Sequence, residues 1–168
     1  IKGQINSSLL EKSIRHAIER KRAEEAIRSA KNYSEYLVEC SLDMIVAANL
    51  DLEITEFNPS AEKMFGYCKS EVLGKSICML FADVHESKQI IEKILKAKIF
   101  AGEINKKKKN GEIFPSFLSA SILKDINDKE IGIVGILRDI TERNRLIDQL
   151  RYNAFHDPLT NLPNRNLF

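Results

Sequence analysis

The order of secondary structure can be built outward from residues 58–67, which read NPSAEKMFGY. Asn58 belongs to a residue type favoured at helix N-caps, and Pro59 suits the first helical position because an N–H there would have no partner within the helix. Gly66 can adopt the left-handed conformation that ends a helix. The stretch therefore predicts a short helix, whose apolar face consists of Ala61, Met64 and Phe65.

Two short strands are expected before this helix and two helical segments after it. Residues 43–48 form an apolar run, residues 49–51 have turn chemistry, and residues 52–57 continue as a second strand. Residues 70–74 suggest a short turn of helix, and residues 84–100 a longer helix with one apolar side.

Three further strands are expected at residues 102–108, 112–123 and 131–138. Asn110-Gly111 is a strong hairpin signal because both residues tolerate a positive φ. The order of two strands, helices and three strands indicates the α+β class, with one antiparallel sheet and the helices on one face.

Composition restricts the classes of partner. The 168 residues carry 26 basic and 24 acidic side chains, a net charge of +2, which gives no support for nucleic acid as a partner. No apolar run approaches the roughly 20 residues that span a bilayer, so no membrane insertion is expected. The three cysteines lack a CxxC spacing and favour reduced thiols. These features together predict a cytoplasmic protein.

Residues 1–40 are expected to contribute a long helix outside the sheet domain. Ser8-Leu9-Leu10-Glu11 is a capping-box pattern, and no Pro or Gly follows it up to Cys40. Apolar residues recur at steps of 3 and 4, which predicts a homodimer through this helix and through the helix that leaves the sheet; packing against its own domain is the alternative. Residues 11–27 resemble the last helix and linker of a receiver domain, which implies a receiver upstream.

The run from Ser41 to Arg143 resembles a PAS domain, and we place the domain itself at residues 41–141. Five motifs in order carry the resemblance: NPSAE (58–62), FGY (65–67), EVLGK (71–75), KNG (109–111) and GILRDIT (135–141). The resemblance implies a five-stranded antiparallel sheet of order 2-1-5-4-3, which cups a pocket under the helices.

The cup is expected to be mostly apolar. The period-2 rule places Phe114, Ser116 and Leu118 on one face of their strand, and the resemblance makes this face the inner one. The cup either binds a small molecule or is filled by its own side chains, and both readings stay open. The candidate pocket residues are Ile45, Phe57, Met64, Ile77, Phe114, Ser116, Leu118, Ile133 and Leu137.

Two cofactor classes of the family can be tested on residue type. Light-sensing flavin (LOV) members need a Cys where alignment at Gly74 places Ile77, with Cys78 one residue away, which on a helix is about 100° of rotation. The flavin-contacting amides of that class are replaced by Lys106, Ser116 and Leu137. LOV-type flavin is therefore rejected.

The histidines argue against haem and against a metal site. Haem-binding members use a His on the long helix, at a position near Gln89, whereas His85 lies near the start of that helix. His16 and His156 lie outside the core, so no metal cluster is expected.

Lys106-Lys107-Lys108-Lys109 forms a basic run next to the predicted hairpin turn. Such a run could meet a phosphate or a membrane surface. Because no aromatic residue interleaves it, we interpret it as a solvated hairpin tip.

Asp139-Ile140-Thr141 closes the last predicted strand, and Thr141 is a natural N-cap for the signalling helix expected at residues 142–156. The PAS resemblance assigns this triplet a coupling role between the sheet and the exit helix. A change in the cup would shift the last strand and, through it, the helix.

Residues 157–165, DPLTNLPNR, resemble the opening motif of GGDEF (diguanylate cyclase) domains, so residues 157–168 would begin such a domain. The resemblance implies that Asp157 and Arg165 brace the turn and that Asn164 contacts guanine. The chain itself is expected to be non-catalytic, while the parent protein is expected to be a diguanylate cyclase with a PAS sensor. The alternative is a ligand-free dimerisation and relay module between a receiver and the cyclase.

Overall fold

The computed structural model describes residues 7–155, with side chains from residue 12 onward, and divides the chain into residues 1–40 and 41–168. The first unit contains helix α1 (Ser7–Glu39). Every side chain from Lys12 to Leu37 is exposed. The predicted Ser8–Glu11 capping box lies outside the described side chains. Among the described residues, no helix is long and apolar enough to cross a membrane.

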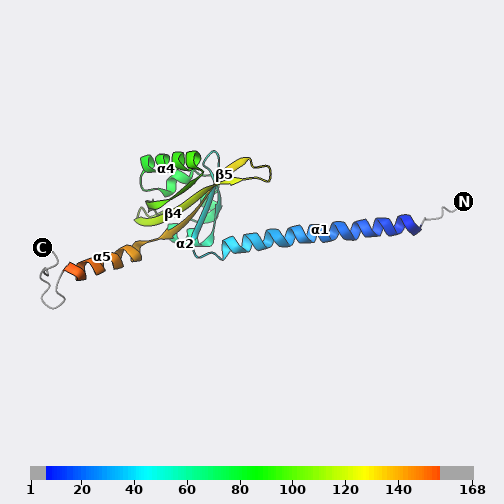
Figure 1. The fold of residues 1–168 in the computed structure, drawn as a ribbon, viewed down its shortest axis with the longest axis horizontal. Coiled ribbons are helices and arrows are strands. Elements are labelled where there is room, and N and C mark those ends of the chain that lie inside the picture. The colour runs from blue at the N-terminus through cyan, green and yellow to red at the C-terminus, as the bar shows by residue number, and fades with distance from the viewer. Residues whose placement is uncertain (1–6, 156–168) are drawn as a thin grey trace. The chain divides into compact units, whose positions relative to one another are not determined.

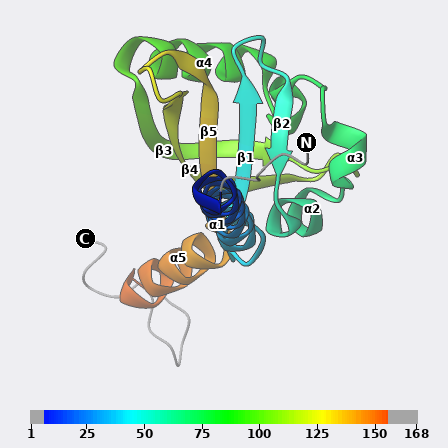
Figure 2. The same cartoon turned by 90° about the vertical axis from the view of Figure 1, so that its right-hand side faces the viewer.

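The second unit is built on one antiparallel sheet. Its strands are β1 (Met44–Asn49), β2 (Ile54–Phe57), β3 (Ile99–Lys107), β4 (Ile113–Lys124) and β5 (Glu130–Asp139). They are arranged in the order β2-β1-β5-β4-β3, with β5 in the centre between β1 and β4 (Figures 1 and 2). Each neighbouring pair is antiparallel. The predicted α+β fold, antiparallel sheet and strand order are confirmed.

Helical segments connect β2 to β3 and follow β5. They are α2 (Pro59–Phe65), α3 (Lys69–Val72), the 3-10 helix η1 (Ile77–Leu80), α4 (Val84–Ala97) and α5 (Thr141–Phe155). In Figure 2, α4 lies across one end of the sheet, and α2 and α3 lie beside β2. The helices between β2 and β3 cover the inner face, so the core forms between them and the sheet.

Both ends of α2 follow the local chemistry predicted for them. The Asn58 side-chain oxygen accepts a hydrogen bond from the Ala61 amide at 3.0 Å. Gly66 takes φ 77°, and its N–H donates to the Glu62 carbonyl. These caps satisfy backbone groups that the helix leaves unpaired at its ends.

The boundary between α4 and β3 differs from the prediction. The helix ends at Ala97, and Lys98 takes the left-handed conformation with φ 65°. Ile99 and Phe100 already belong to β3, where they pair with Ser121 and Ala120. The predicted helix to residue 100 and strand from residue 102 are therefore wrong. The prediction ended the helix at Gly102, the residue type that commonly ends helices, whereas Lys98 takes that conformation.

An aromatic cluster forms part of the core. Phe65 lies between the other two rings, with centroid distances of 5.9 Å to Phe57 and 5.5 Å to Phe114. All three side chains are almost completely buried. This cluster fastens α2 to β2 and β4, so the helix that opens the domain also anchors the sheet.

The central strand β5 approaches β1 closely at Gly132, which leads to a stability prediction. A Cβ added at Gly132 would lie 2.2 Å from the Ala48 carbonyl oxygen, whereas one at Gly135 would meet the flexible end of Leu118 at 3.0 Å. We expect Gly132→Ala to lower the free energy of unfolding by about 2 kcal/mol, because a backbone atom cannot move away locally. Gly135→Ala should cost clearly less. Urea denaturation of both variants tests this, and equal losses would contradict it.

Candidate functional site

A small cavity lies between the inner face of the sheet and the helices. Its volume is about 30 Å³, and its walls come from β1, β3, β4, β5, η1 and α4. A space of this size holds about one or two water molecules. Its walls are formed by Val46, Ala48, Ile77, Leu80, Phe81, Ile91, Ile94, Lys106, Leu118, Ala120, Ile133, Gly135 and Leu137.

The structure brings some of the predicted pocket residues together. Four of them line the cavity: Ile77, Leu118, Ile133 and Leu137. Phe57 and Phe114 are buried in the aromatic cluster of the core. Met64 is half-buried and borders a surface groove that also contains Asp139.

Ser116 is completely buried but does not line the cavity. Its hydroxyl donates to the Ile104 carbonyl on β3 at 3.4 Å, across from it in the strand pairing. A buried hydroxyl needs such a partner to offset its lost hydration. Ser116 therefore satisfies itself within the sheet.

Ile45 was predicted to face the pocket, and the structure contradicts this. Met44, Val46 and Ala48 point into the core, and alternation along β1 places Ile45 on the opposite face of the sheet. Its partner in β5 is Ile136, which borders a groove on that outer face. Residues 44–48 are all apolar, so the sequence did not indicate which of them face the core and which face the other side of the sheet.

Lys106 is a charged residue of the cavity wall that was absent from the predicted pocket, as were several apolar wall residues such as Leu80 and Ile91. It was interpreted as part of a solvated hairpin tip, but it lies on β3 with only 3% of its surface exposed. Alternation along β3 points it inward together with Ile104. Its Nζ lies 3.1 Å from the centroid of the Phe81 ring, which also lines the cavity.

Burial lowers the pKa of the Lys106 ammonium well below its ordinary value, and electrostatic interactions with Glu86 and Cys78 oppose this shift. The Phe81 ring face attracts a cation, but in a desolvated site this attraction is smaller than the cost of lost hydration. Among the described side chains, none forms a salt bridge with Lys106. The cavity wall therefore contains an amine whose charged form is destabilised by burial.

The remaining lysines of the run lie at the surface, as interpreted. Lys107 is exposed on the outer side of β3. Lys108 pairs with Glu112 at 2.7 Å, and Lys109 pairs with Glu71 at 2.6 Å. The Lys109 ammonium lowers the pKa of the Glu71 carboxyl. These two ion pairs hold the hairpin in place, and their carboxylates balance the charges of Lys108 and Lys109.

The residues of the cup do not fit a flavin or a haem. Apolar Ile77 lines the cavity where a photoreactive thiol would be needed, and Cys78 is only half-buried. His85 is exposed at the start of α4 and is not part of the cavity wall. Within residues 12–155, no group of three His, Cys, Asp or Glu side chains could hold a metal ion.

The junction between β5 and α5 has a defined geometry. Asp139 ends β5, and its Oδ1 accepts hydrogen bonds from the Thr141 amide at 2.8 Å and the Thr141 hydroxyl at 2.6 Å. Ile140, between them, is buried, and its N–H donates to the Pro115 carbonyl on β4 at 3.2 Å. The helix begins at Thr141, so the predicted N-cap role of Thr141 is wrong and the Asp139 carboxylate satisfies its amide instead.

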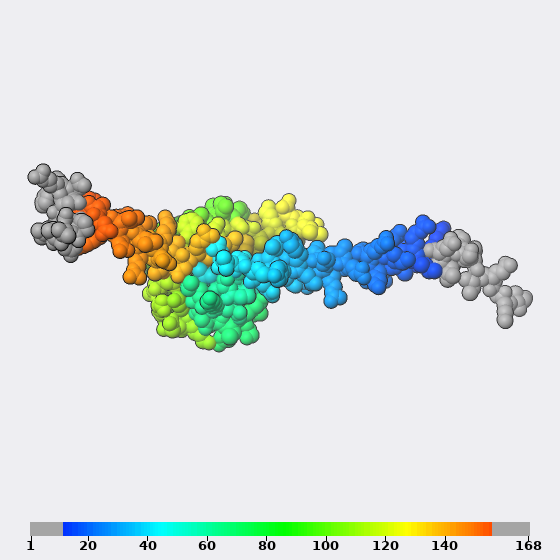
Figure 3. All heavy atoms as spheres, turned by 90° about the horizontal axis from the view of Figure 1, so that it is seen from below, coloured from blue at the N-terminus to red at the C-terminus, as the bar shows by residue number. Residues whose placement is uncertain are grey.

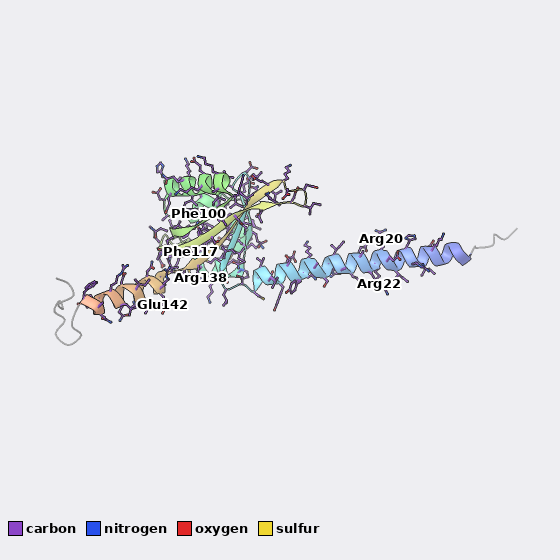
Figure 4. The ribbon with its side chains drawn as sticks, viewed as in Figure 1. Arg20, Arg22, Phe100, Phe117, Arg138 and Glu142 are labelled. Carbon is purple, nitrogen blue, oxygen red and sulfur yellow. The ribbon has the colours of Figure 1, made fainter. Side chains whose placement is uncertain are left out.

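A second set of contacts ties this junction to the rest of the sheet. Arg138 binds Asp43 in a bidentate ion pair, with Nε–Oδ1 at 2.9 Å and Nη2–Oδ2 at 2.6 Å. On α5, Arg143 reaches Glu103 of β3 at 3.2 Å. Figure 4 shows Arg138 and Phe117 on the sheet beside the start of α5, where Glu142 lies. The ribbon of Figure 1 shows β5 leading directly into α5, and Figure 3 shows the orange atoms of α5 protruding from the sheet domain. The exit helix thus begins on a firmly held strand end.

The predicted opening-motif residues Asp157, Asn164 and Arg165 lie outside the described residues. Comparison with known proteins finds two relatives that align with most of the chain. It is 28% identical over 153 residues to the probable diguanylate cyclase DgcE of Escherichia coli. It is 26% identical over 144 residues to the cyclic di-GMP phosphodiesterase PdeB of Shewanella oneidensis. The alignments cover 88% and 84% of this chain, which spans only 14% and 17% of the two relatives.

Solved structures and family models agree on the identity of the fold. A PAS domain from Colwellia psychrerythraea superimposes with a TM-score of 0.62 at 26% identity, over 68% of this chain and 99% of that one. The family model described as PAS domain matches residues 42–142. This range contains the sheet, its covering helices, the cavity and the β5–α5 junction. The chain therefore belongs to the PAS domain family of signalling modules.

Proposed function

We propose that this chain is the sensory and relay segment of a bacterial cyclic di-GMP signalling protein, and that its output domain is a diguanylate cyclase. Both curated relatives are named for enzymes of cyclic di-GMP. The resemblance of residues 157–165 to the opening of GGDEF domains favours synthesis over hydrolysis. The chain itself supplies control rather than catalysis.

The observation that carries this proposal is the route from the cavity to α5. Leu137 of β5 lines the cavity, and Asp139 binds the first residue of α5 two positions later. A displacement of β5 by a change in the cavity therefore acts on the helix through one rigid strand end. Such a direct link would allow the state of the cavity to shift an equilibrium between two arrangements of β5 and α5.

The homodimer stays part of the proposal. The apolar residues Ile14, Ile18 and Ile27 of α1 are exposed, and so are Leu146 and Leu150 of α5. A lone helix with such exposed side chains gains stability by pairing with a second copy. We further propose an upstream receiver and a cytoplasmic location, in keeping with the resemblance of residues 11–27.

A ligand-free relay module is the second candidate function, and the size of the cavity favours it. Pockets for drug-sized ligands commonly measure about 300–1,000 Å³, against about 30 Å³ here. On this reading the input reaches the domain through α1, and the cup only provides a packed core. The β5–α5 junction plays the same part in both readings.

The test is cyclic di-GMP formation from GTP by the full-length protein that contains this chain. Asp139→Ala removes the carboxylate that binds Thr141 and should change the rate about fivefold or more, because an allosteric coupling of this kind is typically worth at least that factor. Asp148→Ala, at an exposed aspartate of α5, is the matched control and should leave the rate unchanged. Equal rates for both variants would contradict the relay, and hydrolysis of cyclic di-GMP without synthesis would contradict the cyclase.

A further inference from the structure

Lys106 lies on the inward face of β3, where an apolar side chain is expected. The other described side chains of the cavity wall are aliphatic or aromatic, from Val46 on β1 to Leu118 on β4 and Leu137 on β5. A lysine in such a place destabilises the fold unless it is used, because its amine loses hydration and forms no salt bridge there. A buried amine in the wall of a cavity, with its Nζ against the Phe81 ring, is a candidate for ligand chemistry.

We propose that the cavity binds a small aliphatic aldehyde or ketone, which the Lys106 amine captures reversibly as an imine. This inference rests on the proposed sensory function and names the chemical class of its input. It makes Lys106 the residue that distinguishes ligand from non-ligand.

The surroundings of Lys106 suit a nucleophilic amine. Desolvation in an apolar pocket shifts a lysine toward its neutral form, and this is the form whose lone pair attacks a carbonyl. The ionisable groups that act on it are Glu86 of α4 and Cys78 of η1, and both favour the ammonium. Burial outweighs them, and the faces contributed by β1, β4 and β5 carry no charge.

The step balances without any redox partner. The amine nitrogen forms a bond to the carbonyl carbon, and a proton moves from nitrogen to oxygen to give a carbinolamine. The hydroxyl group then leaves with the second amine proton as water, and a carbon–nitrogen double bond remains. Hydrolysis reverses both steps, so the adduct can report a changing concentration.

A carbonyl compound fits this site better than an anion does. A carboxylate would create a buried ion pair in a cavity that offers it no second donor among the described side chains, and such pairs often cost more in desolvation than they return. An imine is neutral and adds only apolar atoms. The volume of about 30 Å³ restricts the ligand to a few non-hydrogen atoms, as in acetaldehyde.

The captured ligand would act directly on the relay. Its carbon atoms would fill the space beside Leu118 and Leu137. Leu118 lies close to Gly135 of β5, since a Cβ at Gly135 would approach it to 3.0 Å. Filling the cavity therefore presses on the strand that leads to Asp139.

The experiment traps the imine with acetaldehyde and cyanoborohydride at neutral pH, followed by digestion after glutamate and mass spectrometry. The peptide 104–112, INKKKKNGE, contains Lys106 together with exposed Lys107, which serves as the internal control. We expect ethylation of Lys106 to be at least about tenfold faster than that of Lys107, since each unit by which the pKa falls gives about ten times more neutral amine. In Lys106→Met, ethylation of Lys107 should be unchanged, and circular dichroism should show a folded domain.

Ethylation of Lys106 that is as slow as that of Lys107, or slower, would overturn the proposal. The proposal would also be overturned if acetate protected Lys106 from ethylation and acetaldehyde did not react selectively with it. That result would indicate a site for carboxylates. Because the trapping is read on the chain itself, it can fail while Asp139→Ala still alters the output. In that case the relay stands and carbonyl capture does not.

Discussion

Replacement of Asn58 by alanine is expected to lower the free energy of unfolding by about 3–4 kcal/mol, enough to threaten the fold of a domain this size. The Asn58 side chain accepts from the Ile45 amide at 2.9 Å and the Ala61 amide at 3.0 Å, and it donates to the Asp43 carbonyl at 3.0 Å. Each bond contributes about 1 kcal/mol, and partners left unpaired in a buried site cost more. Urea denaturation followed by circular dichroism measures the loss.

The matched control for this prediction is Asn105→Ala, which changes an exposed asparagine on β3. Its effect should stay within about 0.5 kcal/mol, as for most surface substitutions. A loss at Asn58 no larger than that at Asn105 would show that β1 and α2 do not depend on this amide. That outcome would contradict the role of the Asn58 hydrogen bonds in joining β1 to α2.

Replacement of Lys106 by methionine is expected to stabilise the domain at neutral pH, and the gain should shrink as the pH rises. In the unfolded chain the lysine keeps a pKa near its ordinary value of 10.5, while burial lowers the pKa in the folded state. Between the two pKa values unfolding takes up a proton, so the stability of the wild type increases by about 1.4 kcal/mol per pH unit relative to Lys106→Met. Over two pH units within this window the difference amounts to about 3 kcal/mol.

Urea denaturation of the wild type and of Lys106→Met across the range from neutral pH to the ordinary lysine pKa measures this slope. Lys107→Met, at the exposed neighbour, should have the same pH dependence as the wild type. A constant difference between the wild type and Lys106→Met at every pH would mean that the amine stays protonated in the folded protein. The neutral amine on which carbonyl capture depends would then be absent.

Most of the fold follows from local chemistry that can be read in the sequence. Asn58, Pro59 and Gly66 place α2. In the turn between β3 and β4, Gly111 takes the expected positive φ of 88°, whereas Asn110 does not. The α4–β3 boundary could not be predicted in this way. Lys98 adopts a positive φ that its residue type does not signal, and only tertiary pairing of Ile99 with Ser121 decides it.

The site was harder to predict than the fold, for two physical reasons. Residues 44–48 are all apolar, so the phase of β1 depends on which face the helices cover, and Ile45 was assigned to the wrong face. Alignment with flavin-binding members placed Lys106 at a cup position, but its charge and its basic neighbours led us to interpret it as part of a solvated hairpin tip. Alternation with Ile104 was the signal that could have found it, since two residues along a strand separate side chains on the same face.

Amide hydrogen exchange measures whether a change in the cavity reaches α5 through β5. Gly135→Ala adds one methyl group on the cavity side of β5 against Leu118. The account predicts that exchange changes about fivefold or more at amides of the first turn of α5, and that Asp139→Ala in the same chain abolishes the change in α5 while leaving that in β5. Altered exchange in β5 with α5 amides unchanged from the wild type would contradict the relay.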